Sequence, residues 1–126
     1  MTSRRRVAIT GIGLVTPVGN DVATTWHALL AGRSGGAPIT QFDASGFSTR
    51  IAAEVKGFDD AAAGDRKTLK LTTRAHRFAL AAAEQAFVDA GIRPTAADAT
   101  RWGCTVGAGM MTSEFVDLAA THAHSA

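Results

Sequence analysis

The feature that most constrains the fold of this chain is an apolar run that leads directly into a glycine-rich turn near its start. Residues 6–10 (RVAIT) are mostly β-branched and apolar, which predicts a buried strand. Gly11, Gly13 and Pro17 follow at once, so the next segment is predicted to be a structured loop. A helix is expected over residues 21–31. The chain therefore opens with a strand, a loop and a helix, in that order.

This order invites a comparison with dinucleotide-binding proteins, in which a glycine-rich loop meets a pyrophosphate at the N-terminus of a helix. That motif needs a third glycine so that the helix can pack close to the strand, but Thr16 stands at that place and Pro17 follows it. The helix begins only after Asn20, and the acidic residue expected near position 30 is missing. A dinucleotide-binding oxidoreductase is therefore the weakest of the function hypotheses.

The first helix is predicted to carry a single apolar face. Asn20 is its expected N-cap, and Gly32 is placed to end it. Its large apolar residues fall at positions i, i+4, i+7 and i+8, which lie on one side of a helix. They are Val22, Trp26, Leu29 and Leu30.

The remaining segments alternate between strand and helix patterns. A short strand is expected over residues 51–55, and one long helix over residues 66–90, with Gly91 as its stop. A second buried strand is expected over residues 102–106, and a further helix over residues 113–120. The alternation of strands and helices predicts an α/β fold built in layers.

Composition and charge exclude several classes of protein. The 126 residues are 46% hydrophobic and 19% charged, which is typical of a soluble globular domain or part of one. Thirteen basic and eleven acidic residues give a net charge of only +2, which does not favour binding to nucleic acid. No apolar stretch is long enough to predict a membrane span. Cys104 is the only cysteine, so no intrachain disulfide can form and a cytoplasmic location is expected.

Four stretches of the chain, taken in order, resemble the N-terminal part of the β-ketoacyl-ACP synthases of the type II, elongating kind. Each stretch alone is weakly diagnostic, whereas their order and spacing together are specific, and they cover most of the chain. The stretches are RRVAITGIGLVTPVGNDVATTWHALLAGRSG, ITQFDASGFSTRIAAEV, FALAAAEQAFVDAGI and GCTVGAG.

The resemblance implies an incomplete N-terminal part of the thiolase-like fold, which is layered in the order αβαβα. Residues 1–126 would then be a truncated portion of the N-terminal domain of such a synthase. Members of the family work as homodimers and join a malonyl unit on acyl carrier protein to an acyl chain held on a cysteine. This nucleophile, two histidines and a lysine lie downstream in the family. The resemblance therefore implies no catalytic residue within this chain, and no cofactor is expected.

The resemblance also implies a docking site for the acidic acyl carrier protein at the start of the long helix. Arg66, Lys67 and Lys70 match the basic residues that the family carries there. On one continuous helix they would form a stripe with Arg74 and Arg77, in turns where the helix dipole favours acidic residues instead. The alternative is an ordinary solvated helix face.

A second implied site is the wall of the acyl pocket. Gly107, Ala108, Gly109 and Met110 match a glycine-rich turn that borders this pocket in the family. Met110 would limit or adapt to the acyl chain, since methionine is apolar and flexible. The alternative is that Met110 only fills the core.

The other candidates for chemistry are weak. Cys104 lies in an apolar strand pattern and is predicted to be a small buried residue rather than a nucleophile. His122 and His124 are too few ligands to predict a metal site. The leading hypothesis is thus part of a condensing acyltransferase of fatty-acid or polyketide synthesis. The alternative is a catalytically silent relative that binds carrier protein or a synthase partner.

Overall fold

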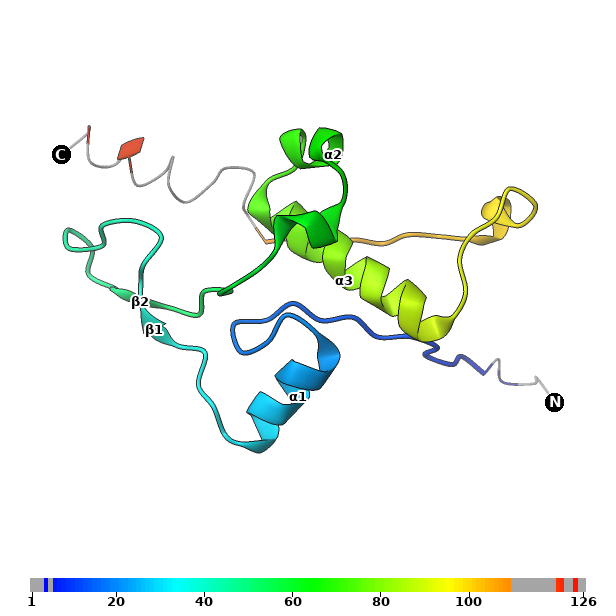
Figure 1. The fold of residues 1–126 in the computed structure, drawn as a ribbon, viewed down its shortest axis with the longest axis horizontal. Helices are drawn as coiled ribbons and strands as arrows, with labels where there is room; N and C mark the ends of the chain where they lie inside the picture. The colour runs from blue at the N-terminus through cyan, green and yellow to red at the C-terminus, as the bar shows by residue number, and fades with distance from the viewer. Residues whose placement is uncertain (1–3, 5, 110–119, 122–123, 125–126) are drawn as a thin grey trace.

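The computed structural model describes residue 4, residues 6–109, and residues 120, 121 and 124. In chain order the elements are α1 (Val22–Leu30), β1 (Ala37–Pro38), β2 (Ile51–Ala52), the 3-10 helix η1 (Asp60–Ala63), α2 (Arg66–Lys70), α3 (Arg74–Ala90) and the 3-10 helix η2 (Ala99–Arg101). Figure 1 shows the first segment, residues 6–20, running between α1 and α3, with α2 above the N-terminal end of α3 and the β1–β2 sheet to the left.

The glycine-rich turn of the first segment lies directly against α3. A Cβ atom on Gly11 would collide with the carbonyl oxygen of Ala86, and one on Gly13 would collide with that of Ala82. The backbone of the turn and the backbone of the helix thus approach each other more closely than any side chain allows. The two glycines are required by packing.

Two side chains of α3 hold the backbone of this turn. The N–H of Ile12 donates to Asp89 Oδ2 at 2.9 Å, and the N–H of Leu14 donates to Gln85 Oε1 at 3.1 Å. Gln85 also donates through Nε2 to the carbonyl of Asn20 at 2.8 Å. These bonds satisfy backbone groups that would otherwise need a strand or water as partner. The loop is therefore fixed on α3 by hydrogen bonds as well as by shape.

The helix α1 begins one residue later than predicted, with Asp21 as its N-cap in place of Asn20. Asp21 Oδ1 accepts a hydrogen bond from the Thr24 N–H at 2.7 Å, and this backbone bond lowers the pKa of the Asp21 carboxyl. The predicted stop is confirmed, because Gly32 has a φ of 63° and its N–H donates to the carbonyl of Leu29 at 3.0 Å.

The predicted apolar face of α1 is not covered by the described part of the chain. The buried residues of this helix are Thr25 and Ala28. Thr25 Oγ1 donates to the carbonyl of Gly19 at 3.2 Å, so α1 packs through small residues against the turn that precedes it. The large apolar residues lie exposed on the other side: Val22, Trp26, Leu29 and Leu30.

The strand predicted over residues 51–55 is present only in part. β2 is two residues long and pairs with β1 in antiparallel fashion. Beyond it, the Glu54 carboxylate accepts hydrogen bonds from the backbone N–H of Thr40 at 3.0 Å and from its hydroxyl at 2.7 Å. A side chain thus replaces the ladder where the strand was expected to continue.

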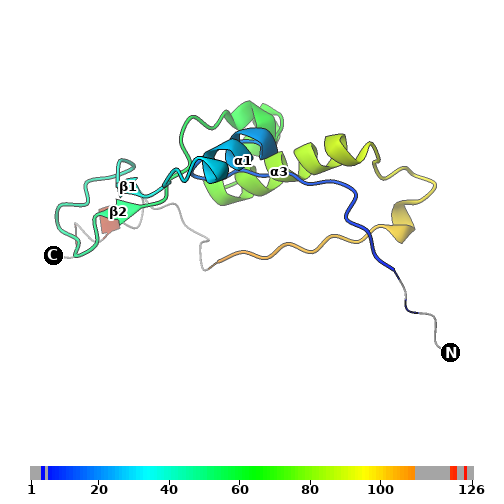
Figure 2. The ribbon, with the colours of Figure 1, turned by 90° about the horizontal axis from the view of Figure 1, so that it is seen from below.

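The strands predicted over residues 6–10 and 102–106 do not form in the described part of the chain. Both segments are extended and lack a neighbouring strand, and Figure 2 shows the second one running apart from the helices. Val7 is 94% exposed and Ile9 is 85% exposed, and Cys104 is also exposed rather than buried as predicted. A strand is stable only when its backbone groups are paired, which a local apolar pattern cannot guarantee.

The single helix predicted over residues 66–90 is in fact two helices, α2 and α3. Thr72 interrupts it, because its hydroxyl donates back to the carbonyl of Thr68 at 3.1 Å and competes with helical continuation. Thr73 then begins α3 as its N-cap, and its backbone N–H donates to Nδ1 of His76 at 3.4 Å. The two threonines therefore make a break that apolar periodicity does not reveal.

The end of α3 is confirmed, since Gly91 adopts a left-handed φ of 65° directly after the helix. The packed face of α3 is made of small residues and backbone. Ala81 is buried, and the carbonyls of Ala82 and Ala86 meet the glycine-rich turn, whereas Leu80 is 40% exposed. Small residues again make the close contacts.

The core of the described part is small. Its buried hydrophobic residues are Ala28, Ala63 and Ala81, while many large apolar side chains are exposed. Burial of alanine contributes little, because stabilisation scales with the apolar area that is removed from water. Among the residues described, no helix has both the length and the apolar character that crossing a membrane requires.

We therefore expect that a polypeptide of these 126 residues alone retains helical signal but does not unfold cooperatively. Its exposed apolar surface should bind a hydrophobic dye and promote aggregation. Circular dichroism during heating, combined with sedimentation, measures both properties. A monomer with one sharp melting transition and no dye binding would contradict this expectation.

Candidate functional site

The basic residues predicted for carrier docking share the short helix α2. Arg66, Lys67 and Lys70 are all exposed, and within the described chain none of them forms an ion pair. Asp65 is the N-cap of this helix, and its Oδ1 accepts a hydrogen bond from the Thr68 N–H at 2.8 Å. That backbone bond lowers the pKa of the Asp65 carboxyl. α2 is thus a capped turn of helix that carries exposed positive charge.

The break after α2 changes the electrostatic argument for this site. Because the helix ends at Lys70, both Lys67 and Lys70 lie in its last turn, where the helix dipole favours cations. The sequence interpretation placed them in the opening turns of a long helix, where cations are disfavoured. The helix dipole therefore does not disfavour these two lysines, and it gives no reason to expect an anionic partner for them.

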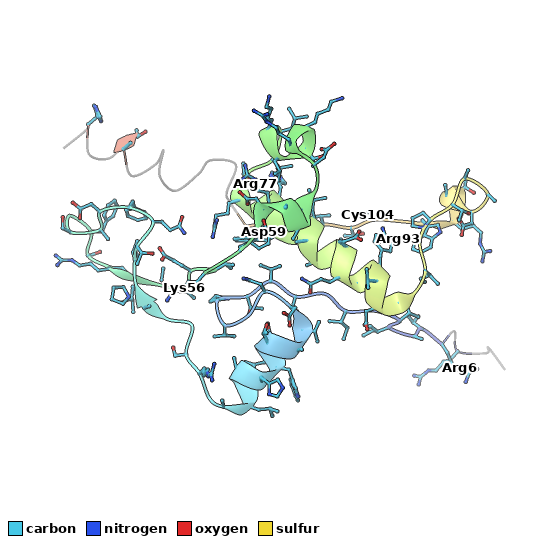
Figure 3. All side chains as sticks on the ribbon, in the orientation of Figure 1. Arg6, Lys56, Asp59, Arg77, Arg93 and Cys104 are labelled. Carbon is cyan, nitrogen blue, oxygen red and sulfur yellow. The ribbon has the colours of Figure 1, made fainter. Side chains whose placement is uncertain are left out.

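The predicted stripe of five basic residues is also divided. Arg74 Nη2 donates to the carbonyl of Val55 at 2.9 Å, and its guanidinium lies 4.9 Å from the ring centre of Phe78. Arg77 forms an ion pair with Asp60 at 2.8 Å and is labelled beside η1 in Figure 3. Both arginines make contacts within the protein. Of the five, Arg66, Lys67 and Lys70 on α2 remain exposed and without an ion pair in the described chain.

The sequence analysis missed the role of η1, which holds Asp60. A usable signal was present, since paired aspartates followed by three alanines are typical of a helix start. Asp59 Oδ1 indeed caps η1 by accepting a hydrogen bond from the Ala61 N–H at 2.9 Å.

The turn predicted to border an acyl pocket is extended and exposed over residues 107–109. Added Cβ atoms on Gly107 and Gly109 would meet no other atom within 4 Å. Met110 lies outside the described residues. The described structure does not bring this turn together with α2, and the pocket-lining role remains a prediction.

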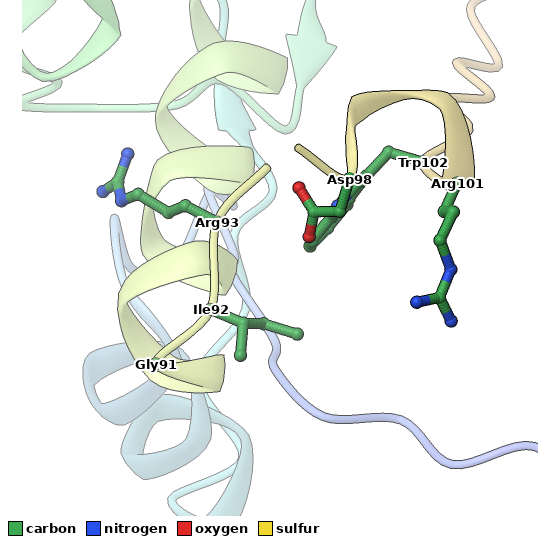
Figure 4. A pocket seen from close by; sticks show the side chains of 6 residues that line it. All are labelled: Gly91, Ile92, Arg93, Asp98, Arg101 and Trp102. Carbon is green, nitrogen blue, oxygen red and sulfur yellow. The ribbon is translucent and has the colours of Figure 1, made fainter. Parts of the chain in front are cut away.

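A pocket of about 650 Å³ lies between the end of α3 and η2 (Figure 4). Arg93 at its edge is paired with Glu84, and the hydrogen bond from Arg93 lowers the pKa of that carboxyl. Asp98 accepts a hydrogen bond from the Thr95 hydroxyl at 2.6 Å, and this bond is the main cause of its lowered pKa. These charges are engaged in local contacts. The lining residues are Gly91, Ile92, Arg93, Asp98, Arg101 and Trp102.

Two backbone donors of the glycine-rich turn are committed to α3. The amides of Ile12 and Leu14 already donate to side chains of α3. Thr16 is engaged as well, since its hydroxyl donates to the carbonyl of Gly19 at 3.1 Å. A pyrophosphate site needs such amides to point at the ligand. The geometry therefore agrees with a packing role for the turn.

Metal ligands are not gathered in the described residues, which contain no group of three or more histidine, cysteine or acidic side chains suited to one ion. His124 Nδ1 is hydrogen-bonded to the carbonyl of Ala120 at 2.9 Å. His122, its neighbour in the sequence, lies outside the described residues.

Comparisons with known proteins identify the relatives of this chain. The family model described as "Beta-ketoacyl synthase, N-terminal domain" matches residues 4–125. A Coxiella burnetii protein named 3-oxoacyl-[acyl-carrier-protein] synthase 2 is 49% identical over 107 residues, which are 85% of this chain. A Vibrio cholerae protein of the same name is 40% identical over 115 residues, or 91% of this chain.

A solved structure shows the same relationship in three dimensions. The ishigamide ketosynthase/chain length factor superposes with a TM-score of 0.66 and 41% sequence identity, over 72% of this chain and 23% of the other. The chain spans only 26% and 28% of the lengths of the two curated relatives. These matches confirm the resemblance found in the sequence. The protein belongs to the β-ketoacyl synthase family, through that family's N-terminal domain, and carries an incomplete part of its thiolase-like α/β fold.

Proposed function

We propose that this chain is the N-terminal part of a 3-oxoacyl-[acyl-carrier-protein] synthase, an acyltransferase that joins a malonyl unit on carrier protein to an acyl chain. The observation that carries the proposal is the 49% identity to the Coxiella burnetii protein of that name. Residues 1–126 would form a truncated portion of the N-terminal domain. In this proposal the catalytic residues lie outside the chain, and the complete enzyme is a cytoplasmic homodimer of fatty-acid or polyketide synthesis.

Within that enzyme, α2 would dock the acidic acyl carrier protein. Arg66, Lys67 and Lys70 are exposed on one short helix and have no acidic partner within the described chain. Such a group of cations attracts an acidic partner and orients it during encounter. Docking through α2 also leaves Arg74 and Arg77 to their internal contacts.

The second part of the proposal concerns the acyl chain. Gly107, Ala108, Gly109 and Met110 would border its pocket once the rest of the enzyme covers this segment. The exposure of residues 107–109 supports the idea that another surface packs on them. In that setting Met110 would influence the preferred acyl length.

A hybrid synthase tests the function directly. In this hybrid, the 107 residues of the chain that align with the Coxiella burnetii protein replace their counterparts in that protein. The measured quantity is the rate of condensation of malonyl and acyl groups on carrier protein. We expect the hybrid to form 3-oxoacyl product at a rate within about tenfold of the parent, since the replaced part holds no catalytic residue in this account. A folded hybrid with no activity beside an active parent would contradict the proposal and favour the catalytically silent alternative.

Charge reversal on α2 tests the docking surface. In the hybrid, the double variant Lys67→Glu, Lys70→Glu should weaken carrier binding about tenfold, equivalent to about 1.4 kcal/mol. The salt dependence of binding should also become flatter, because fewer opposite charges meet at the interface. Titration calorimetry at two salt concentrations provides both values.

The matched control is Arg33→Glu, Arg101→Glu, which changes the net charge equally at two exposed arginines outside α2. It should leave the affinity within about twofold of the parent, because well-separated charges are screened. Equal losses in the two double variants would point to net charge alone and remove the case for docking at α2.

A further inference from the structure

The contacts of Arg77 join three elements at the end of α2. Its Nη2 donates to the carbonyl oxygen of Leu69 at 3.1 Å and to that of Thr72 at 3.2 Å. Its Nη1 forms the ion pair with Asp60 Oδ2 at 2.8 Å. Arg77 lies on α3 and therefore connects three parts of the chain: the last turn of α2, the link between α2 and α3 at Thr72, and η1 (Figure 3).

The helix α2 depends on such outside contacts because it is only five residues long. Starting a helix is unfavourable, and isolated helices shorter than about 12 residues are marginal in water. Asp65 caps the N-terminal end of α2. At the other end, the carbonyls of Thr68 and Leu69 accept from the backbone N–H groups of Leu71 at 3.0 Å and Thr72 at 3.5 Å. Arg77 adds a charged donor to the long bond at Leu69, and the Thr72 hydroxyl adds a second donor at Thr68.

The surroundings make arginine difficult to replace at this position. The side chain of Arg77 is 26% exposed and that of Asp60 is 43% exposed, so the pair is partly shielded from water. A guanidinium group offers donors in several directions from one rigid plane, whereas an ammonium is a compact point charge. Removal of Arg77 would leave the Asp60 carboxylate without its cation and would deprive two carbonyls of a donor.

These contacts lead us to infer that Arg77 is a positioning residue for the carrier-docking helix. It does not touch the carrier. It fixes the last turn of α2, and with it the spacing and direction of Lys67 and Lys70. This inference rests on the proposed docking function of α2. Arg77 belongs to the predicted basic stripe, but its inferred role is to hold α2 in place and not to bind the carrier.

The test uses the hybrid synthase and the variant Arg77→Gln, with Arg93→Gln as the matched control. Like Arg77, Arg93 forms an ion pair with one carboxylate, in this case that of Glu84. It lies beyond the C-terminal end of α3, far from α2 in sequence, and 54% of its side chain is exposed. Hydrogen exchange over residues 66–72 reports the order of α2. KM is measured for an acyl group on carrier protein and for the same acyl group on a short thiol without the carrier.

We expect Arg77→Gln to speed exchange over residues 66–72 and to raise KM for the carrier-linked substrate about tenfold, a ratio that corresponds to one charged hydrogen bond. KM for the short thioester and its kcat should stay within about twofold, because the chemistry does not involve α2. Arg77→Lys should recover part of the loss, since it keeps a cation beside Asp60. Arg93→Gln should change none of these values.

The outcomes separate this inference from the docking proposal. If Lys67→Glu, Lys70→Glu raises the carrier KM but Arg77→Gln and Arg77→Lys do not, docking stands and the positioning role of Arg77 is overturned. If the lysine variant has no effect, the docking proposal fails and the inference fails with it. Equal loss of activity toward both substrates in Arg77→Gln would mean general destabilisation, and this too would overturn the positioning role.

Discussion

The close approach of the glycine-rich turn to α3 is the contact on which the rest of the structure depends. Gly11 and Gly13 have no room for a side chain, and the amides between and after them donate to Asp89 and Gln85 of the helix. These bonds pair backbone groups that have no strand beside them in the described chain. The first segment is thereby fixed on α3 without a sheet partner.

The helix α3 serves as the common support for the other elements. Its N-terminal half holds η1 and α2 through Arg77, and the rings of Phe58 and Phe78 meet edge to face at 4.9 Å. Its C-terminal half holds the turn and, through Gln85, the carbonyl of Asn20 just before the N-cap of α1. The basic residues of α2 are therefore oriented by the same helix that seats the start of the chain. The glycine-rich turn and the proposed docking surface on α2 thus share α3 as their support.

Local signals in the sequence predicted local structure well. Gly32 and Gly91 end their helices as expected, and Gly11 and Gly13 shape a turn that packs on α3. Features that depend on distant partners were not predictable. The runs at residues 6–10 and 102–106 have strand composition, but no strand lies beside them among the described residues. The break at Thr72 involves a hydroxyl that bonds to the preceding turn. The three candidate docking residues could be found from the resemblance, whereas the separate role of Arg77 needed its contacts with Leu69 and Asp60.

The most direct test of this account is the stability of the hybrid synthase with Gly13→Ala, beside the control Gly46→Ala. A Cβ atom on Gly13 meets the backbone of α3, whereas one on Gly46 meets nothing within 4 Å. The account predicts that Gly13→Ala lowers the free energy of unfolding by about 1–3 kcal/mol, the usual cost of overpacking. It predicts that Gly46→Ala changes it by less than about 0.5 kcal/mol, as at an ordinary surface position. Equal values for the two variants in denaturant unfolding would contradict the claim that contact with α3 is what requires the glycine.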